Sequence, residues 1–124
     1  MKEIRELTKA EEPLMQVLWR LKKGVIKEIA EKMPEPKPAY NTIATVLKVL
    51  KTKGFVNYKT VDNAYVYYPL ISEKEYTRFA FNKVFSNYFS GSYSQLVSFL
   101  VEEKNMDDDT KNELMKVANK LKEE

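Results

Sequence analysis

The sequence predicts a mostly α-helical protein with one small β-hairpin. Three observations support this fold class: apolar residues recur at helical spacing before Gly54, two β-branched and aromatic runs with period two follow it, and helical spacing returns from Ser72 to the end. We therefore expect a mixed domain over residues 1–71 and an all-α domain over residues 72–124.

Two helices are predicted first. Thr8 and Glu11 form a T-x-x-E capping box at the start of an apolar pattern that covers residues 8–23. A short second helix is expected over residues 25–33. The three prolines of Pro34–Pro38 cannot continue a helix, so this segment is expected to be a stiff connector.

The third predicted helix, Ala39–Gly54, has two different faces. Four apolar residues fall within an arc of about 100°, as a core-facing stripe requires; they are Ile43, Val46, Leu47 and Leu50. The opposite face bears short polar groups and lysines without an acid: Asn41, Ala44, Thr45, Lys48, Lys51 and Thr52. Such a face suits an element that approaches phosphates and hydrogen-bonds base edges. An ordinary solvated helix face is the alternative.

A β-hairpin is predicted directly after this helix. Residues 55–60 and 64–68 are β-branched and aromatic runs, and Asp62 and Asn63 between them tolerate the left-handed conformations of hairpin turns. Three helices followed by a hairpin within about 60 residues is the order of a winged helix-turn-helix domain, in which the third helix enters the major groove and the hairpin covers the adjacent backbone or minor groove.

The charge distribution is uneven. Residues 1–70 hold 13 basic and 8 acidic side chains, whereas residues 71–124 hold 8 basic and 10 acidic ones. Pro36–Val61 contains five lysines and no acid over 26 residues. A polyanionic partner would relieve the repulsion among these lysines. A basic face that docks an acidic protein surface remains the main alternative.

The C-terminal region is predicted to contain three helices, over residues 72–89, 92–104 and 107–124. Some 50 residues cannot by themselves bury so much aromatic and aliphatic surface. We expect a second copy of the chain to cover it, with packing onto the N-terminal domain as the alternative. The residues expected at this dimer interface are Phe79, Phe81, Phe85, Phe89, Leu96, Phe99, Leu100, Leu114, Val117 and Leu121.

Missing residue types exclude several functions. The chain has 124 residues without cysteine or histidine, so zinc sites built from these residues, disulfides and imidazole-activated nucleophiles are impossible. None of the three glycines lies in a phosphate-binding loop. The sequence shows no signal peptide and no apolar run long enough to span a membrane. We expect a cytoplasmic binding protein that is not an enzyme and carries no cofactor or metal.

Four segments resemble the penicillinase-repressor (BlaI/MecI/CopY) family of winged-helix transcriptional regulators. The first is the run from Leu7 to Trp19 with its Leu-Thr-Lys-Ala-Glu start, and the second runs from Ala39 to Phe55 with Ala-Tyr-Asn-Thr-Ile, Thr-Val-Leu and Lys-Gly-Phe. The third is Tyr67-Tyr68-Pro69-Leu70, and the fourth is the C-terminal segment with Leu96-Val97 and Val101-Glu102. The resemblance implies a homodimeric repressor that binds a palindromic operator in double-stranded DNA. A membrane sensor-protease is a further implied partner.

The resemblance also implies which residues contact DNA. The third helix would contribute Tyr40, Asn41, Thr42, Ala44, Thr45, Lys48 and Lys51, and the hairpin Lys59 and Asn63. Members that respond to β-lactams are cut at an Asn-Phe bond in the dimerisation domain; the matching bond here is Phe99–Leu100, a possible cleavage site. Members that respond to copper use cysteine pairs, so direct copper sensing is not expected. Val49 stands where the family often has arginine.

Overall fold

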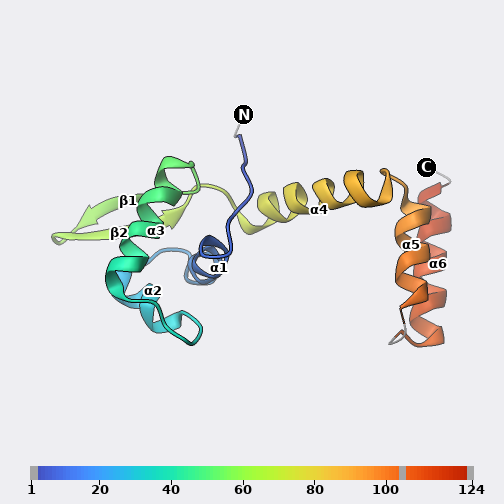
Figure 1. The fold of residues 1–124 in the computed structure, drawn as a ribbon, viewed down its shortest axis with the longest axis horizontal. Helices are drawn as coiled ribbons and strands as arrows, with labels where there is room; N and C mark the ends of the chain where they lie inside the picture. Colours follow the sequence, from blue (N-terminus) through green and yellow to red (C-terminus); the bar gives the residue numbers. More distant parts are fainter. Residues whose placement is uncertain (1–2, 104–105, 123–124) are drawn as a thin grey trace. The chain divides into compact units, whose positions relative to one another are not determined.

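The computed structural model describes residues 3–103 and 106–122. Within them the chain forms six helices and one antiparallel hairpin (Figure 1). The elements in chain order are α1 (Glu11–Leu21), α2 (Ile26–Lys32), α3 (Tyr40–Thr52), β1 (Val56–Val61), β2 (Ala64–Pro69), α4 (Glu73–Phe89), α5 (Tyr93–Glu102) and α6 (Asp108–Lys122). The predicted fold class is confirmed, and the ends of the elements differ from the predicted ones by three residues at most, apart from the predicted helix ends at residues 104 and 124, which lie outside the described residues.

The chain divides into two compact units, residues 1–78 and 79–124. These units differ from the predicted domains, 1–71 and 72–124, by the beginning of α4. The reason is Tyr76, whose ring packs against Trp19 and Phe55 of the first unit with centroid separations of 6.0 and 5.8 Å. The first unit therefore includes the first turns of a helix that the sequence assigns to the C-terminal domain.

The core of the first unit joins α1, α2, α3 and the hairpin. Its buried hydrophobic side chains are Leu7, Leu14, Met15, Val17, Leu18, Ile29, Met33, Ile43, Leu47, Leu50, Phe55, Val56, Tyr67 and Ile71. The α3 residues of this core are those of the predicted apolar stripe, with Val46 half-buried beside them. Trp19 packs against the same core and donates a 2.9 Å hydrogen bond from Nε1 to the Ile71 carbonyl. The position of α3 is thus fixed by its apolar side.

The hairpin is held to the rest of the unit by backbone hydrogen bonds. Gly24, which precedes α2, exchanges two of them with Tyr67, at 2.9 and 2.8 Å, while the Leu70 amide donates to the Phe55 carbonyl at 2.7 Å and so closes the open end of the hairpin itself. The two-residue turn has positive φ at both Asp62 and Asn63, 50° and 66°, as predicted from the residue types. This turn fixes a register in which Tyr58 pairs with Tyr67 and Thr60 with Tyr65.

The link from α3 to β1 requires a glycine. Gly54 has φ +83°, in the left-handed region that a side chain disfavours. The chain therefore reverses immediately after α3 and places β1 beside it.

The second unit consists of the rest of α4 with α5 and α6, of which α5 and α6 lie side by side (Figure 1). The Ser92 hydroxyl caps the start of α5 by accepting from the Gln95 amide at 3.3 Å, and Asp107 accepts from the Thr110 amide at 2.7 Å. Among the described residues of this unit, no hydrophobic side chain is fully buried. In the part of the chain that the structure describes, none of the helices has the length and apolar character that crossing a membrane requires.

Candidate nucleic-acid interface

Two sides of α3 have opposite environments. Ile43, Leu47 and Leu50 are buried in the core, whereas the side predicted to face a nucleic acid is open to solvent. Its exposed residues are Asn41, Thr45, Lys48, Lys51 and Thr52, with Ala44 half-buried among them. Val49, where the family often has arginine, is also exposed. The sequence therefore located the solvent-facing side of the helix correctly.

The threonine hydroxyls on this side are oriented by their own helix. Thr45 donates from Oγ1 to the Asn41 carbonyl at 2.9 Å, and Thr52 donates to the Lys48 carbonyl at 3.1 Å. Because each hydroxyl hydrogen is engaged, each oxygen is presented as an acceptor. Such an acceptor fits the exocyclic amino groups of adenine and cytosine in the major groove.

The start of α3 presents backbone donors. Tyr40, Asn41 and Thr42 are exposed, and in the described part of the chain no side chain caps the helix at Ala39. The first turn holds no acid. Amides without a side-chain cap at the positive end of a 13-residue helix are favourable partners for phosphate groups.

The hairpin places its predicted contact residues on its outer part. Lys59 and Asn63 are both exposed, Asn63 within the turn itself. The Lys59 ammonium lies 5.7 Å from the ring centroid of Tyr68, on the same side of the hairpin. This contact limits the freedom of the lysine without neutralising its charge.

Three tyrosines on the other side of the hairpin were not predicted as site residues. Tyr58, Tyr65 and Tyr67 border a cleft of about 430 Å³ together with Lys48, Lys51 and Thr52 of α3, and with Ala44 and Leu47. A signal for them was present, because a two-residue turn after Val61 sets the strand register and puts these three tyrosines on one side.

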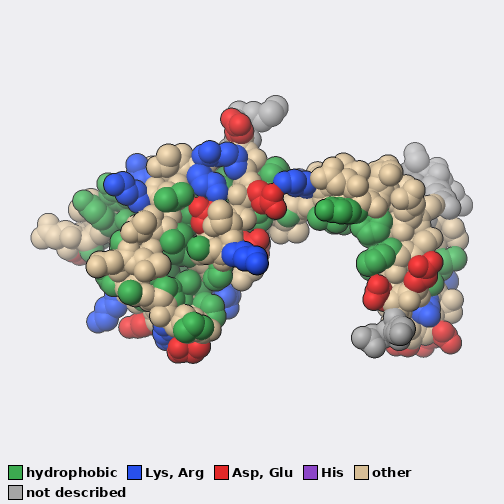
Figure 2. Space-filling model, viewed as in Figure 1, with side chains coloured by type: hydrophobic (Ala, Val, Ile, Leu, Met, Phe, Trp, Pro, Cys, Tyr) green, Lys and Arg blue, Asp and Glu red, His purple; other side chains and the backbone are tan. Residues whose placement is uncertain are grey.

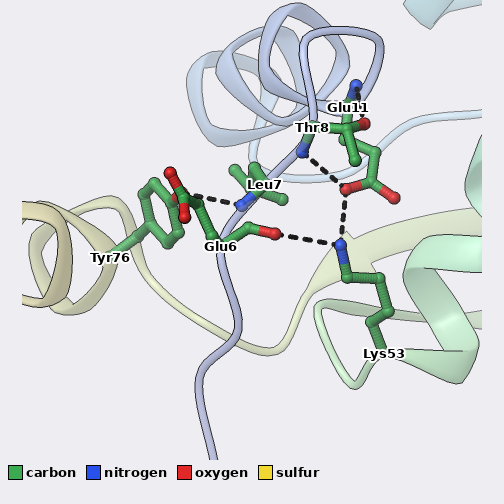
Figure 3. Close-up of polar contacts among 6 residues, drawn as sticks. All are labelled: Glu6, Leu7, Thr8, Glu11, Lys53 and Tyr76. Atoms are coloured by element: carbon green, nitrogen blue, oxygen red, sulfur yellow. Dashed lines mark hydrogen bonds and ion pairs between the residues drawn. The ribbon is translucent and has the colours of Figure 1, made fainter.

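One lysine of the acid-free segment is not available to a partner. Lys53 Nζ lies 2.6 Å from Glu11 Oε1 and donates to the Glu6 carbonyl at 3.1 Å (Figure 3). Both side chains are largely buried, with exposed fractions of 13% for Lys53 and 5% for Glu11. The five lysines of Pro36–Val61 therefore leave at most four for an outer ligand.

Glu11 caps the start of α1, as predicted, and also forms the ion pair with Lys53. Its Oε1 accepts from the Thr8 amide at 2.9 Å, and its own amide donates to Thr8 Oγ1 at 3.3 Å, so the predicted capping box is confirmed. Burial raises the pKa of the carboxyl, but the hydrogen bonds from Lys53 and Thr8 and the charge of Lys53 outweigh it, and the pKa lies below 4.5. The same N-terminal segment is bound by Tyr76, whose hydroxyl oxygen accepts from the Leu7 amide at 2.9 Å (Figure 3).

The residues predicted for dimerisation lie in α4, α5 and α6. Phe81, Phe99 and Val117 are exposed, while the described remainder, Phe79, Phe85, Phe89, Leu96, Leu100 and Leu114, is half-buried. The side chain of Leu121 lies outside the described residues. Hydrophobic side chains gather along one side of α4 (Figure 2). Aromatic rings contact one another within the unit, at 5.4 Å for Phe81 and Phe85 and 5.5 Å for Phe89 and Phe99.

Comparison with known proteins identifies the family. The family model described as Penicillinase repressor matches residues 7–120. The chain belongs to the penicillinase repressor family. The methicillin resistance regulatory protein MecI of Staphylococcus aureus (strain N315) is 29% identical over 117 residues, which cover 93% of this chain and 94% of MecI. The penicillinase repressor of Bacillus licheniformis is 28% identical over 127 residues, covering 98% and 96% of the two chains.

Solved structures of this family match the winged-helix part. The solution structure of the DNA-binding domain of the repressor BlaI has a TM-score of 0.52 and 30% identity, and covers 61% of this chain and 94% of its own. The Bacillus licheniformis BlaI monomer in complex with the blaP half-operator has a TM-score of 0.51 with the same identity and coverage. The predicted winged-helix fold is thus confirmed.

Proposed function

We propose that this protein is a transcriptional repressor that binds a palindromic operator in double-stranded DNA as a homodimer. Among its relatives, BlaI forms a complex with a half-operator. The observation that carries the proposal is the solvent-facing side of α3, which combines hydroxyl, amide and ammonium groups with no acid. The proposed function needs no catalytic step and is exerted in the cytoplasm.

The chemistry of α3 supports both parts of DNA recognition. Lys48 and Lys51 supply charge for phosphates, and Asn41 and Thr45 supply groups that can hydrogen-bond base edges. One helix in one groove offers few base contacts, each worth about 1–3 kcal/mol. A monomer would therefore discriminate weakly between sequences, and two linked recognition helices double the number of contacts.

The second unit supports the dimer. Its 46 residues, 79–124, are too few to bury their aromatic side chains alone. Tyr88 is 78% exposed, Val117 55% and Phe99 50%, which is much apolar surface for a monomer. A second copy of the chain, joined through these helices, would cover this surface and fix the separation of the two recognition helices.

Salt dependence tests DNA binding. The affinity of the purified protein for a duplex from its own promoter is measured by fluorescence anisotropy at a series of salt concentrations. A DNA-binding protein gives a linear fall of log affinity with log salt, with a slope equivalent to several phosphates. Absence of duplex binding in dilute buffer, with retained binding to an acidic protein, would instead support the alternative, in which the basic face docks an acidic protein surface.

Release by proteolysis is the proposed regulatory step, with Phe99–Leu100 as the scissile bond. The bond lies within α5. Because a protease needs an extended chain, α5 has to unfold locally before the bond can be cut, so the stability of this helix would control the rate of cleavage. Co-expression with a sensor protease encoded nearby, followed by inducer, is expected to yield fragments that end at Phe99. An intact protein after induction contradicts this step and leaves operator binding unaffected.

A further inference from the structure

Lysines and tyrosines line the cleft between α3 and the hairpin. Its α3 wall carries Lys48, Lys51 and Thr52, and its hairpin wall carries Tyr58 and Tyr65 with Tyr67 at its base. The cleft measures about 430 Å³ and is open to solvent, as the 53% exposure of Tyr65 shows. Among the described residues that line it, none is acidic.

The aromatic wall is ordered by mutual contacts. The ring centroids of Tyr58 and Tyr65 are 4.3 Å apart, and those of Tyr58 and Tyr67 are 5.5 Å apart. The Lys51 ammonium lies 5.7 Å from the Tyr58 centroid, which joins the two walls. These contacts hold the rings, and with them the phenol groups, at defined positions.

Each tyrosine hydroxyl brings one O–H donor to the cleft. Burial, followed by the proximity of Tyr58, Tyr65 and Tyr40, raises the pKa of Tyr67. The described lining combines two lysine side chains with these hydroxyls and includes no carboxylate. A ligand that matches this set is an anion with several acceptor oxygens, and the phosphodiester backbone is such a ligand.

The geometry of duplex DNA places such a backbone between these two elements. A helix in the major groove and a hairpin at the adjacent minor groove are separated by the one sugar–phosphate strand that divides the grooves. Given the proposed function, we propose that the cleft holds this strand, with Lys48 and Lys51 as charged contacts and the Tyr58 and Tyr65 hydroxyls as neutral donors to phosphate oxygens.

Neutral and charged contacts with phosphates affect the salt dependence of binding differently, which makes the proposal testable in the full-length protein. The double variant Tyr58→Phe/Tyr65→Phe keeps both rings and removes two donors. We expect it to bind operator and unrelated duplexes about tenfold more weakly, with an unchanged salt slope, because a neutral donor releases no counterion. Lys51→Gln should instead reduce the slope by about one.

Tyr68→Phe is the matched control, because it removes one tyrosine hydroxyl from β2, the strand that also holds Tyr65, but on the opposite side of the hairpin. It should bind like the unaltered protein. Equal thermal unfolding of all variants shows that the rings still pack. If the double variant binds both duplexes as tightly as the unaltered protein, the cleft does not hold the backbone, while the proposed function stands.

Two other results also overturn the proposal. A loss confined to the operator would mean that the tyrosines contact bases, and a reduced salt slope in the double variant would mean that they act through the lysines. If the unaltered protein shows no salt-dependent duplex binding, the proposed function and the cleft proposal both fail.

Discussion

The two units of the molecule differ most in what they bury. The described part of the first unit has fourteen buried hydrophobic residues, including Phe55, Leu47 and Leu50, which are fully enclosed. The described part of the second unit has a higher density of aromatic rings, yet its hydrophobic side chains remain exposed or half-buried. The first unit thus encloses a hydrophobic core of its own, whereas the described side chains of the second unit do not.

This difference fits the two tasks of the proposed repressor, DNA recognition by the first unit and regulated association by the second. A rigid core is what a recognition helix needs, because base contacts require fixed side-chain positions. A helical unit without a fully enclosed core suits the proposed release step, because opening or cutting α5 would weaken operator binding without altering α3.

The largest expected effect comes from a core substitution in the first unit. Leu47 is fully buried on the inner side of α3, and Leu47→Ala should lower the free energy of unfolding by about 2–5 kcal/mol at every protein concentration. Phe81→Ala in the second unit should instead make the unfolding midpoint depend less steeply on protein concentration than it does for the unaltered protein, because it weakens the association whose contribution to stability grows with concentration. Urea denaturation at two protein concentrations distinguishes the two variants. If both variants respond to protein concentration in the same way, the proposed contrast between the units is wrong.

The next effect concerns the buried ion pair. Glu11→Gln should lower the free energy of unfolding at pH 7 by about 2–3 kcal/mol, because it leaves Lys53 without its anionic partner. Since folding lowers the pKa of Glu11, the stabilisation is present above about pH 4.5 and is lost as the pH falls through the pKa of the folded state.

Thermal unfolding measured from pH 7 down to pH 3 tests this predicted loss of stabilisation at low pH. The difference between Glu11→Gln and the unaltered protein should shrink as the pH falls. The neighbouring exposed Glu12→Gln is the matched control and should change stability little at either end. A difference that stays constant with pH would show that the carboxylate charge is not what stabilises this contact.

Truncation separates the two units. A variant that ends at Arg78 keeps the whole first unit, and it should bind the operator at least about tenfold more weakly than the full chain, since it loses the second recognition helix. A variant that ends at Leu70 also loses Tyr76 and its contacts with Leu7, Trp19 and Phe55, so it should in addition unfold at lower temperature. Equal operator affinity of the Arg78 variant and the full chain would contradict the coupling of the units.

The smallest effects are expected at α3 itself. Thr45→Ala removes one base-edge acceptor and should reduce the preference for operator over unrelated duplex by about 1 kcal/mol or more. Lys48→Ala should weaken binding to both duplexes and reduce the salt slope by about one. Gel-shift titrations on the two duplexes measure both. If both variants match the unaltered protein, α3 does not enter the groove.

Elements with strong local patterns were predictable from the sequence. The apolar stripe of α3 has helical spacing, Thr8 and Glu11 form a local capping box, and Asp62 and Asn63 occupy the turn for which their backbone preferences suit them. Each of these features depends on residues at most a few positions apart, so periodicity and residue type suffice to place them.

Contacts between distant segments were not predictable in this way. Glu11 and Lys53 are 42 positions apart, and Leu7 and Tyr76 are 69 apart. No periodicity singles out Tyr76 from the five other aromatic residues that follow it in α4, or Lys53 from the other lysines near it. The tyrosine-lined cleft required one further step, because the strand register places the three rings on one side but only the packing of α3 shows what faces them.

Footprinting on the promoter of its own gene tests most directly the central claim, that two copies of the chain each present α3 to one duplex. We predict two equivalent protected segments related by twofold symmetry, with centres about ten base pairs, or a multiple of that spacing, apart. A single protected segment without symmetry, or uniform weak protection along the duplex, would contradict it.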